Sequence, residues 1–284
     1  MRFSSGTRAF TLSGAGTLTL GASGVVNQSA TAQAVSAPLK LGAAAPFTVS
    51  STGALNIIGT VDTNAFALTL NGAGTGGGTL SLANDTGLAF GRNTTISATS
   101  TVASDLLSSG TGITHTLGTL GIAAVTLTAN ASNNVTSGTA GVTFGATTLT
   151  GTAIISPSAN TQLTPGSITS TNPGATIAGN LALTGLHTFT GQTLVQAGTL
   201  TFDTLANVNA GSSALGNPAD ATAGTIKLVN TTTAATIAYT GTGHTSGRAL
   251  DLARTTGGAA SISAPTAPRN PGPARSPSST TPSA

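Results

Sequence analysis

Pairs of apolar residues separated by a single residue recur from Phe10 onward, and glycine stands beside many of them. Alternation with a period of two is typical of short half-buried strands, and glycine between strands allows tight turns. Leu18 and Leu39 lie 21 residues apart, as do Phe47 and Leu68, so the strands return at a nearly constant spacing. This near-period predicts a coil of strands with about twenty residues in each rung.

The expected fold is therefore all-β, a right-handed parallel β-helix (β-solenoid) over residues 1–263. With about twenty-two residues per rung and a rise of about 4.8 Å, it would have about twelve rungs and a length of about 55 to 60 Å. The triplets become sparse between Thr94 and Gly121, where we expect a longer loop or one irregular rung. Pro157, Pro165 and Pro173 lack the N–H group that a strand ladder needs, which predicts that they lie at corners.

The composition favours strands over helices. Only 5% of the residues are charged and glycine occupies 38 positions, whereas an ordinary globular domain is about 25% charged. With 38% hydrophobic residues the chain is still apolar enough to fold. The basic residues form no cluster and aromatic residues for stacking are scarce, so we expect no nucleic-acid binding. The sequence contains no run of about 18 apolar residues, so we expect no transmembrane segment.

Two stretches predict something other than a packed strand. Residues 264–284 are rich in Pro and Ser and lack apolar alternation, which predicts a disordered C-terminal tail. The glycine-rich run at residues 71–79 lacks the helix and the Lys of nucleotide-binding loops and the Asp of calcium-binding repeats. That run therefore predicts a structural turn.

The stretch at residues 181–202 shows the strand pattern most clearly, with apolar residues alternating with Thr and Ala between glycines. It resembles the autotransporter-associated β-strand repeat, whose pattern is approximately L-T-G-x-N-T-Y-T-G-x-T-x-V-x-A-G-T-L, over residues 183–200. His187 stands where that family usually has Asn, and Phe189 replaces its Tyr. The matching positions make up the predicted structural repeat motif, namely Gly185, Thr188, Phe189, Thr190, Gly191, Val195, Ala197, Gly198, Thr199 and Leu200.

Within this motif, Gly191 is expected to mark a required corner. It stands between Phe189 and the next apolar run, where the family also has Gly, so we expect a positive φ that a residue with a Cβ would strain. The following Gln192 is expected to face solvent.

The resemblance covers residues 181–262, because Leu215-Gly216-Asn217-Pro218 is similar to the usual continuation of the family. It implies the passenger part of an autotransporter or of a related giant bacterial surface protein, with adhesion or display as its role. The implied location is secreted or on the bacterial cell surface, associated with the outer membrane. The implied partner is a surface glycan or the surface of a host or neighbouring cell.

Neither end of the chain carries an export or anchoring signal that we recognise. Residues 1–8 are not followed by the apolar core of a signal peptide. The C-terminal part of the sequence lacks successive alternating strands of about ten residues, so we do not expect the outer-membrane barrel of an autotransporter in it. We therefore expect a fragment of a longer protein, a degenerate copy, or a member that is anchored differently.

The sequence predicts no catalytic residue, metal site or cofactor. His115, His187 and His244 stand without a metal-binding motif, and His187 is expected to bond the local backbone of a turn. An enzyme that hydrolyses or cleaves polysaccharides is the alternative, and glycoside hydrolysis needs two carboxylates beside the bond. Contacts between rungs would have to unite two of the six scattered acids, Asp62, Asp85, Asp105, Asp203, Asp220 and Asp251.

A third alternative comes from four Thr-Leu-Thr units, at residues 17–19, 126–128, 148–150 and 199–201. If these units line up on one face, they form a flat array of hydroxyl and methyl groups suited to ice or glycan. The competing explanation is that Thr is a favoured exposed strand residue.

Overall fold

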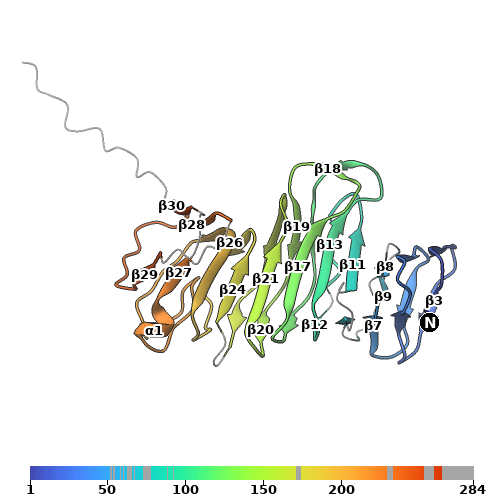
Figure 1. Cartoon of the computed structure of the whole chain (residues 1–284), viewed down its shortest axis with the longest axis horizontal. Helices are drawn as coiled ribbons and strands as arrows, with labels where there is room; N and C mark the ends of the chain where they lie inside the picture. The colour runs from blue at the N-terminus through green and yellow to red at the C-terminus, as the bar shows by residue number, and fades with distance from the viewer. Residues whose placement is uncertain are drawn as a thin grey trace, which may run out of the picture.

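The chain forms an elongated β-solenoid of about ten turns in the computed structural model (Figure 1). The structure describes residues 1–51, 53, 55–57, 59, 61–62, 66, 68–72, 78–87, 89–91, 93–170, 174–228, 233–252 and 259–263. The predicted disordered tail, Pro173 and residues 73–77 of the glycine-rich run lie outside these residues. All pairings between strands of the described part are parallel, apart from one isolated bridge between His187 and Ser213. The prediction of an all-β parallel solenoid is confirmed.

Three faces of parallel strands run along the coil, and each face extends over only some of the rungs. The first face is one sheet of β1 (Arg2–Phe3), β4 (Val25–Asn27), β7 (Ala45–Val49), β10 (Leu68–Gly72), β12 (Thr94–Ile96), β16 (Leu120–Ile122), β20 (Thr147–Leu149) and β23 (Ile168–Thr169). The second face is formed by β11 (Gly78–Ala83), β13 (Ser100–Asp105), β17 (Thr126–Ala131), β21 (Ala153–Pro157), β24 (Ala175–Ala178), the first half of β26 (Thr193–Phe202), β27 (Ile226–Leu228) and β29 (Leu250–Asp251).

The third face is formed by β15 (Thr114–Thr116), β19 (Ala140–Thr143), β22 (Thr161–Thr164), β25 (Leu181–Leu183), the second half of β26, β28 (Ala235–Tyr239) and β30 (Ala260–Ser263). Strand β26 bends, so that it pairs with β24 on the second face and with β25 on the third. In the N-terminal rungs, two shorter sheets accompany the first face. They are β2 (Phe10–Leu12), β5 (Gln33–Val35) and β8 (Leu55–Ile57), and β3 (Leu18–Leu20), β6 (Leu39–Leu41) and β9 (Val61–Asp62).

Inward side chains stack in columns, one residue per rung, and these columns are the core. On the third face the paired column is His115, Val142, Leu163, Leu181, Leu200, Ile237 and Ile262. Leu163, Leu181 and Leu200 are at most 1% exposed, whereas the final Ile262 is 60% exposed because no described rung covers it. A fully buried Leu contributes about 1.5 to 3 kcal/mol, so neighbouring rungs supply most of each rung's stability.

The rungs differ in length more than the sequence predicts. The partner of Ile122 is Leu149, 27 residues on, whereas Leu181 pairs with Leu200 after 19. Leu200 pairs with Ile237 after 37 residues, because the intervening loop contains the short helix α1 (Ala221–Gly224). The expected number of about twelve rungs was therefore too high.

Part of the additional length in the middle of the chain forms a projecting arm. Here β14 (Gly110–Thr111) pairs with β18 (Val135–Ser137) of the next rung, beyond the edge of the body (Figure 1). The expectation of a loop or an irregular rung between Thr94 and Gly121 is correct only for this arm, since β12, β13, β15 and β16 in the same segment continue the faces in register.

Glycine and proline lie at corners, but not always where the sequence predicted. Gly198 has a φ of 76°, and a Cβ on Gly179 would lie 2.0 Å from the carbonyl oxygen of Pro157. Pro157 ends β21, and Pro165 directly follows β22. Gly191 is not among the glycines with positive φ, so that prediction was wrong. Positive φ occurs at Gly185 and Gly198 instead, and Gly191 lies two residues before the start of β26.

No helix in the described part is long and apolar enough to cross a membrane.

Candidate functional site

The outward side of the third face is polar and uncharged. One outward column contains Thr114, Gly141, Gln162, Asn180, Thr199, Thr236 and Ser261, and the other contains Thr116, Thr143, Thr164, Ala182, Thr201, Ala238 and Ser263. Both columns follow from the period of two, because each outward residue is next to an inward one. Neither column carries an ionisable or aromatic side chain, so this face offers hydrogen bonds without charge.

Two hollows meet where the second face turns into the third, and we call them together the corner groove. One has a volume of about 340 Å³ and is lined by Thr139, Asn160, Thr161, Gln162, Asn180, Leu181, Thr199 and Thr201. The other has a volume of about 430 Å³, lies beside the arm, and is lined by Ala131, Val135, Thr136, Ser137, Gly138, Thr139, Ala159 and Asn160. They share Thr139 and Asn160, so the corner groove extends from the arm across successive rungs.

Three amide side chains stand among the threonine and serine residues that line the corner groove. Asn180 Oδ1 accepts a hydrogen bond of 3.1 Å from the Thr199 N–H, which fixes the orientation of the amide. Asn160 has a φ of 57°, a conformation that Asn tolerates better than most residues. Gln162 is exposed. The Thr161 hydroxyl is buried and has no hydrogen-bond partner.

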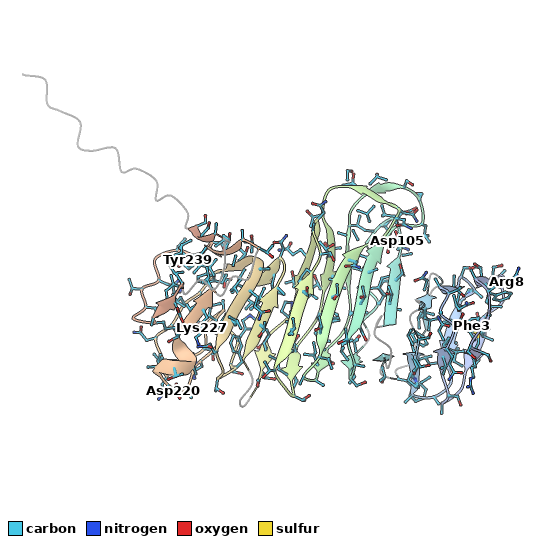
Figure 2. All side chains as sticks on the ribbon, viewed as in Figure 1. Phe3, Arg8, Asp105, Asp220, Lys227 and Tyr239 are labelled. Carbon is cyan, nitrogen blue, oxygen red and sulfur yellow. The ribbon has the colours of Figure 1, made fainter. Side chains whose placement is uncertain are left out.

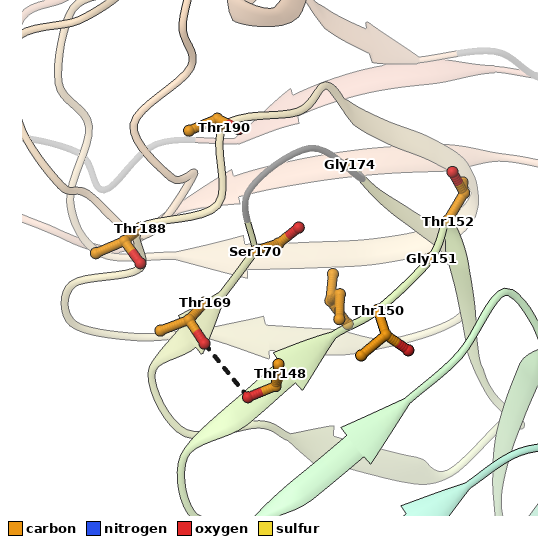
Figure 3. Close-up of a pocket in the computed structure, with 10 residues that line it drawn as sticks. Thr148, Thr150, Gly151, Thr152, Thr169, Ser170, Gly174, Thr188 and Thr190 are labelled. Atoms are coloured by element: carbon orange, nitrogen blue, oxygen red, sulfur yellow. Dashed lines mark hydrogen bonds between the residues drawn. The ribbon is translucent and has the colours of Figure 1, made fainter.

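A larger hollow of about 1000 Å³ lies on the first face, and we call it the threonine groove (Figure 3). It is lined by Thr148, Leu149, Thr150, Gly151, Thr152, Thr169, Ser170, Gly174, Thr188 and Thr190. The hydroxyl groups of Thr148 and Thr169 lie 3.4 Å apart and bond each other across neighbouring rungs. Ser170 and Gly174 flank residues 171–173, which lie outside the described residues, so this wall of the groove is not defined.

His187 is a buried structural residue. It is 0% exposed, and its Nδ1 accepts a hydrogen bond of 2.7 Å from the main-chain N–H of Ile168. Burial lowers the pKa of His187 from 6.5 to about 4, although the charge of Asp203 opposes this shift. The sequence did not predict this bond to the preceding rung, although a hydrogen bond with the Thr184 main chain, in the turn of His187 itself, also acts on the ring and raises its pKa.

The other histidines also bond within the protein. His115 is 0% exposed in the inward column of the third face, and its Nε2 lies 3.0 Å from the Asp105 carbonyl oxygen. Its ring meets Phe90 edge to face. His244 is exposed, and its Nδ1 lies 2.6 Å from the hydroxyl of Tyr239. Among the described residues, no group of three or more His, Cys, Asp or Glu could hold a metal ion.

Four of the six aspartates accept hydrogen bonds from main-chain N–H groups. Asp203 binds the N–H of Gly185, and Asp220 caps α1 through the N–H of Ala223. Asp85 binds the N–H groups of Leu107 and Ser108, and Asp105 binds those of Leu106 and Asn134. In β29, Asp251 pairs in register with Lys227; the side chain of Asp62 lies outside the described part.

Asp85 and Asp105 both accept hydrogen bonds from main-chain N–H groups of residues 106–108, and Asp105 lies at the base of the arm (Figure 2). The main-chain N–H of Ser108 lowers the pKa of Asp85. A general acid in glycoside hydrolysis needs the opposite shift. Neither acid lines the corner groove or the threonine groove as the structure describes them.

The Thr-Leu-Thr units do not line up. Those at residues 17–19, 126–128, 148–150 and 199–201 lie in or beside β3, β17, β20 and β26, which belong to different sheets or faces. The flat array that the third alternative needs does not form from these units, because their strands belong to different faces. The first face does carry two threonine pairs, Thr69 with Thr95 and Thr148 with Thr169, and Gly121 stands between the two pairs.

The predicted repeat motif contributes to the body of the solenoid and to both grooves. Phe189, Val195 and Leu200 are 0% exposed. Thr188 and Thr190 line the threonine groove, and Thr199 lines the corner groove. Gly185 and Gly198 have positive φ, whereas Gly191 lies two residues before β26 and Ala197 lies within it. Sequence reasoning missed Asn160, Gln162 and Asn180, although the spacing of 20 residues between the two asparagines was visible.

Comparison of the chain with family models, with curated proteins and with solved structures finds no match.

Proposed function

We propose that this chain is a non-enzymatic structural and adhesive β-helix region of an exported bacterial surface protein. The observation that carries the proposal is the outward side of the third face, where hydroxyl and amide groups repeat over seven strands without an ionisable side chain. Such a face offers many similar weak contacts to an extended partner, and multivalent adhesion depends on contacts of this kind.

Two further features support this proposal. The resemblance of residues 183–200 to the autotransporter-associated repeat implies a passenger region on the cell surface. Asp85, at the base of the arm, accepts hydrogen bonds from main-chain N–H groups, and its lowered pKa suits that structural role. The chain would then act as a long support of low charge that presents its faces to a surface glycan or to another cell.

The test has a location arm and an adhesion arm. Intact cells of the source organism are treated with an external protease and probed with an antibody against this chain, and beads coated with the purified chain are offered to bacterial and host cells. We expect the protease to remove the antigen and the beads to attach more strongly than albumin-coated beads. An antigen reached only after lysis, together with attachment no stronger than albumin, would contradict the proposal.

A further inference from the structure

We propose that the corner groove binds one strand of an uncharged polysaccharide lying along the solenoid axis, with the amides of Asn160, Gln162 and Asn180 as its main hydrogen-bonding groups. This inference rests on the proposed adhesive function and specifies the partner chemistry and the place where it binds. The three amides belong to two successive rungs, and Thr139 and Thr199 continue the lining on the rungs before and after them.

The spacing of the groups suits a polymer of sugars. Successive rungs are about 4.8 Å apart, which is about the length that one pyranose residue adds to an extended chain. Residues on consecutive rungs would therefore meet consecutive sugars in the same way. A compact ligand would contact only one rung and would leave most of the corner groove empty.

The available hydrogen bonds suit sugar hydroxyl groups. Each amide offers both a donor and an acceptor, as a hydroxyl does. Asn180 uses its Oδ1 for the Thr199 N–H, which leaves its NH₂ group directed away from that bond. Thr161, which is only 1% exposed, lies on the inward side of β22, so the exposed Gln162 next to it is the residue of this strand that a ligand would meet.

Charge and aromatic content narrow the ligand class further. The lining contains no Asp, Glu, Lys, Arg or His, so nothing there would repay the desolvation of an anionic polysaccharide or a phosphate. The lining also contains no aromatic ring for stacking against a sugar. Binding then depends on hydrogen bonds in competition with water, and we expect a dissociation constant of about 1 mM for one site, strengthened by repetition on a surface.

The corner groove is a better candidate than the larger threonine groove for two reasons. Its lining is fully described, whereas the threonine groove borders residues 171–173. Its polar groups include amides that the protein leaves largely free, whereas Thr148 and Thr169 already bond each other. The threonine groove therefore supplies a control of similar exposure.

The experiment measures binding of the purified chain to dextran, a soluble mannan and a soluble β-glucan by affinity electrophoresis and by NMR titration. Polygalacturonate serves as the anionic comparison. The test variant combines Asn160→Gly with Gln162→Ala. Glycine suits the φ of 57° at position 160, and the Gln162 side chain is exposed, so the fold is retained. The matched control is Thr188→Ala, an exposed residue of the threonine groove.

We expect at least one neutral polysaccharide to bind, the double variant to bind it about tenfold more weakly, and the control to bind within about twofold of the unmodified chain. The inference is overturned if none of the three neutral polymers binds, if polygalacturonate binds at least as well, or if Thr188→Ala has the larger effect. If beads coated with the double variant attach to cells as strongly as beads coated with the unmodified chain, the adhesive function stands and the corner groove is rejected as its site.

Discussion

The main-chain N–H of Ile168 donates a hydrogen bond of 2.7 Å to Nδ1 of His187, and this bond joins two neighbouring rungs inside the solenoid. It requires an unprotonated Nδ1, because a protonated imidazole has donors at both nitrogens. The bond therefore couples the protonation of one side chain to the stacking of the rungs.

The first prediction concerns pH. The pKa of His187 is about 4 in the folded protein and 6.5 as its ordinary value, so the unfolded state binds more protons between these limits. Stability should be at its maximum above pH 6.5 and should fall by up to about 3 kcal/mol as the pH drops toward 4. Urea unfolding at a series of pH values measures this. In His187→Gln the free energy of unfolding should fall much less between pH 6.5 and 4. An unchanged dependence on pH in this variant would mean that another group causes the fall.

The second prediction compares two corner glycines. Gly179→Ala should destabilise by more than about 3 kcal/mol, because its Cβ would lie 2.0 Å from the Pro157 carbonyl oxygen and the backbone would have to move. Gly185→Ala should cost only about 1 to 2 kcal/mol, since its φ is 82° but nothing lies within 4 Å of the added Cβ. Thermal unfolding of both variants provides the measurement. The reverse order would mean that close approach of rungs does not limit this corner.

The third prediction concerns the arm. Asp85→Ala removes the acceptor of the Leu107 and Ser108 N–H groups, so the base of the arm should open more often. Hydrogen exchange should accelerate at residues 106–111 and at their partners in β18, while the unfolding midpoint of the body changes little. Asp220→Ala, which removes the cap of α1, is the matched control and should leave exchange in the arm unchanged. Equal exchange in both variants would contradict the role of Asp85.

The fourth prediction concerns the core column of the third face. Leu200→Ala should destabilise by about 2 to 5 kcal/mol through the cavity that it leaves, since Leu200 is 0% exposed. Because each rung contacts mainly its neighbours, exchange should rise first in β25 and β28, which flank β26. Thr201→Ala, on the outward side of the same strand, should change stability by less than about 0.5 kcal/mol. A uniform rise along the whole chain would indicate a single cooperative unit.

The sequence predicts strands and their inward side well, because alternation is a local property. Leu18 and Leu39 were expected to be one rung apart, and they pair directly. Phe47 and Leu68 were expected to pair too, yet Phe47 pairs with Leu70, two residues further on. Register depends on how many residues each corner takes up, and corners carry no repeating apolar pattern. The same uncertainty made the number of rungs too high.

The candidate site was predicted less well, because grooves arise between rungs. Asn160, Gln162 and Asn180 are ordinary polar residues in the sequence, and only the pairing of β22 with β25 brings them to one hollow. The bond of His187 to another rung was missed for the same reason. Its partner, Ile168, lies 19 residues earlier, which no short motif reveals.

The uncovered Ile262 at the end of its column has an evolutionary consequence. From Leu163 to Ile237 each residue of the column has an aliphatic neighbour on either side, so removing or duplicating a whole rung there would leave the remaining neighbours chemically unchanged. A single inserted residue within a strand would instead turn the inward side outward. Chains of this architecture should therefore vary in size by entire rungs, joined at equivalent corners, and the total length is a quantity that recombination can alter without redesigning the interior.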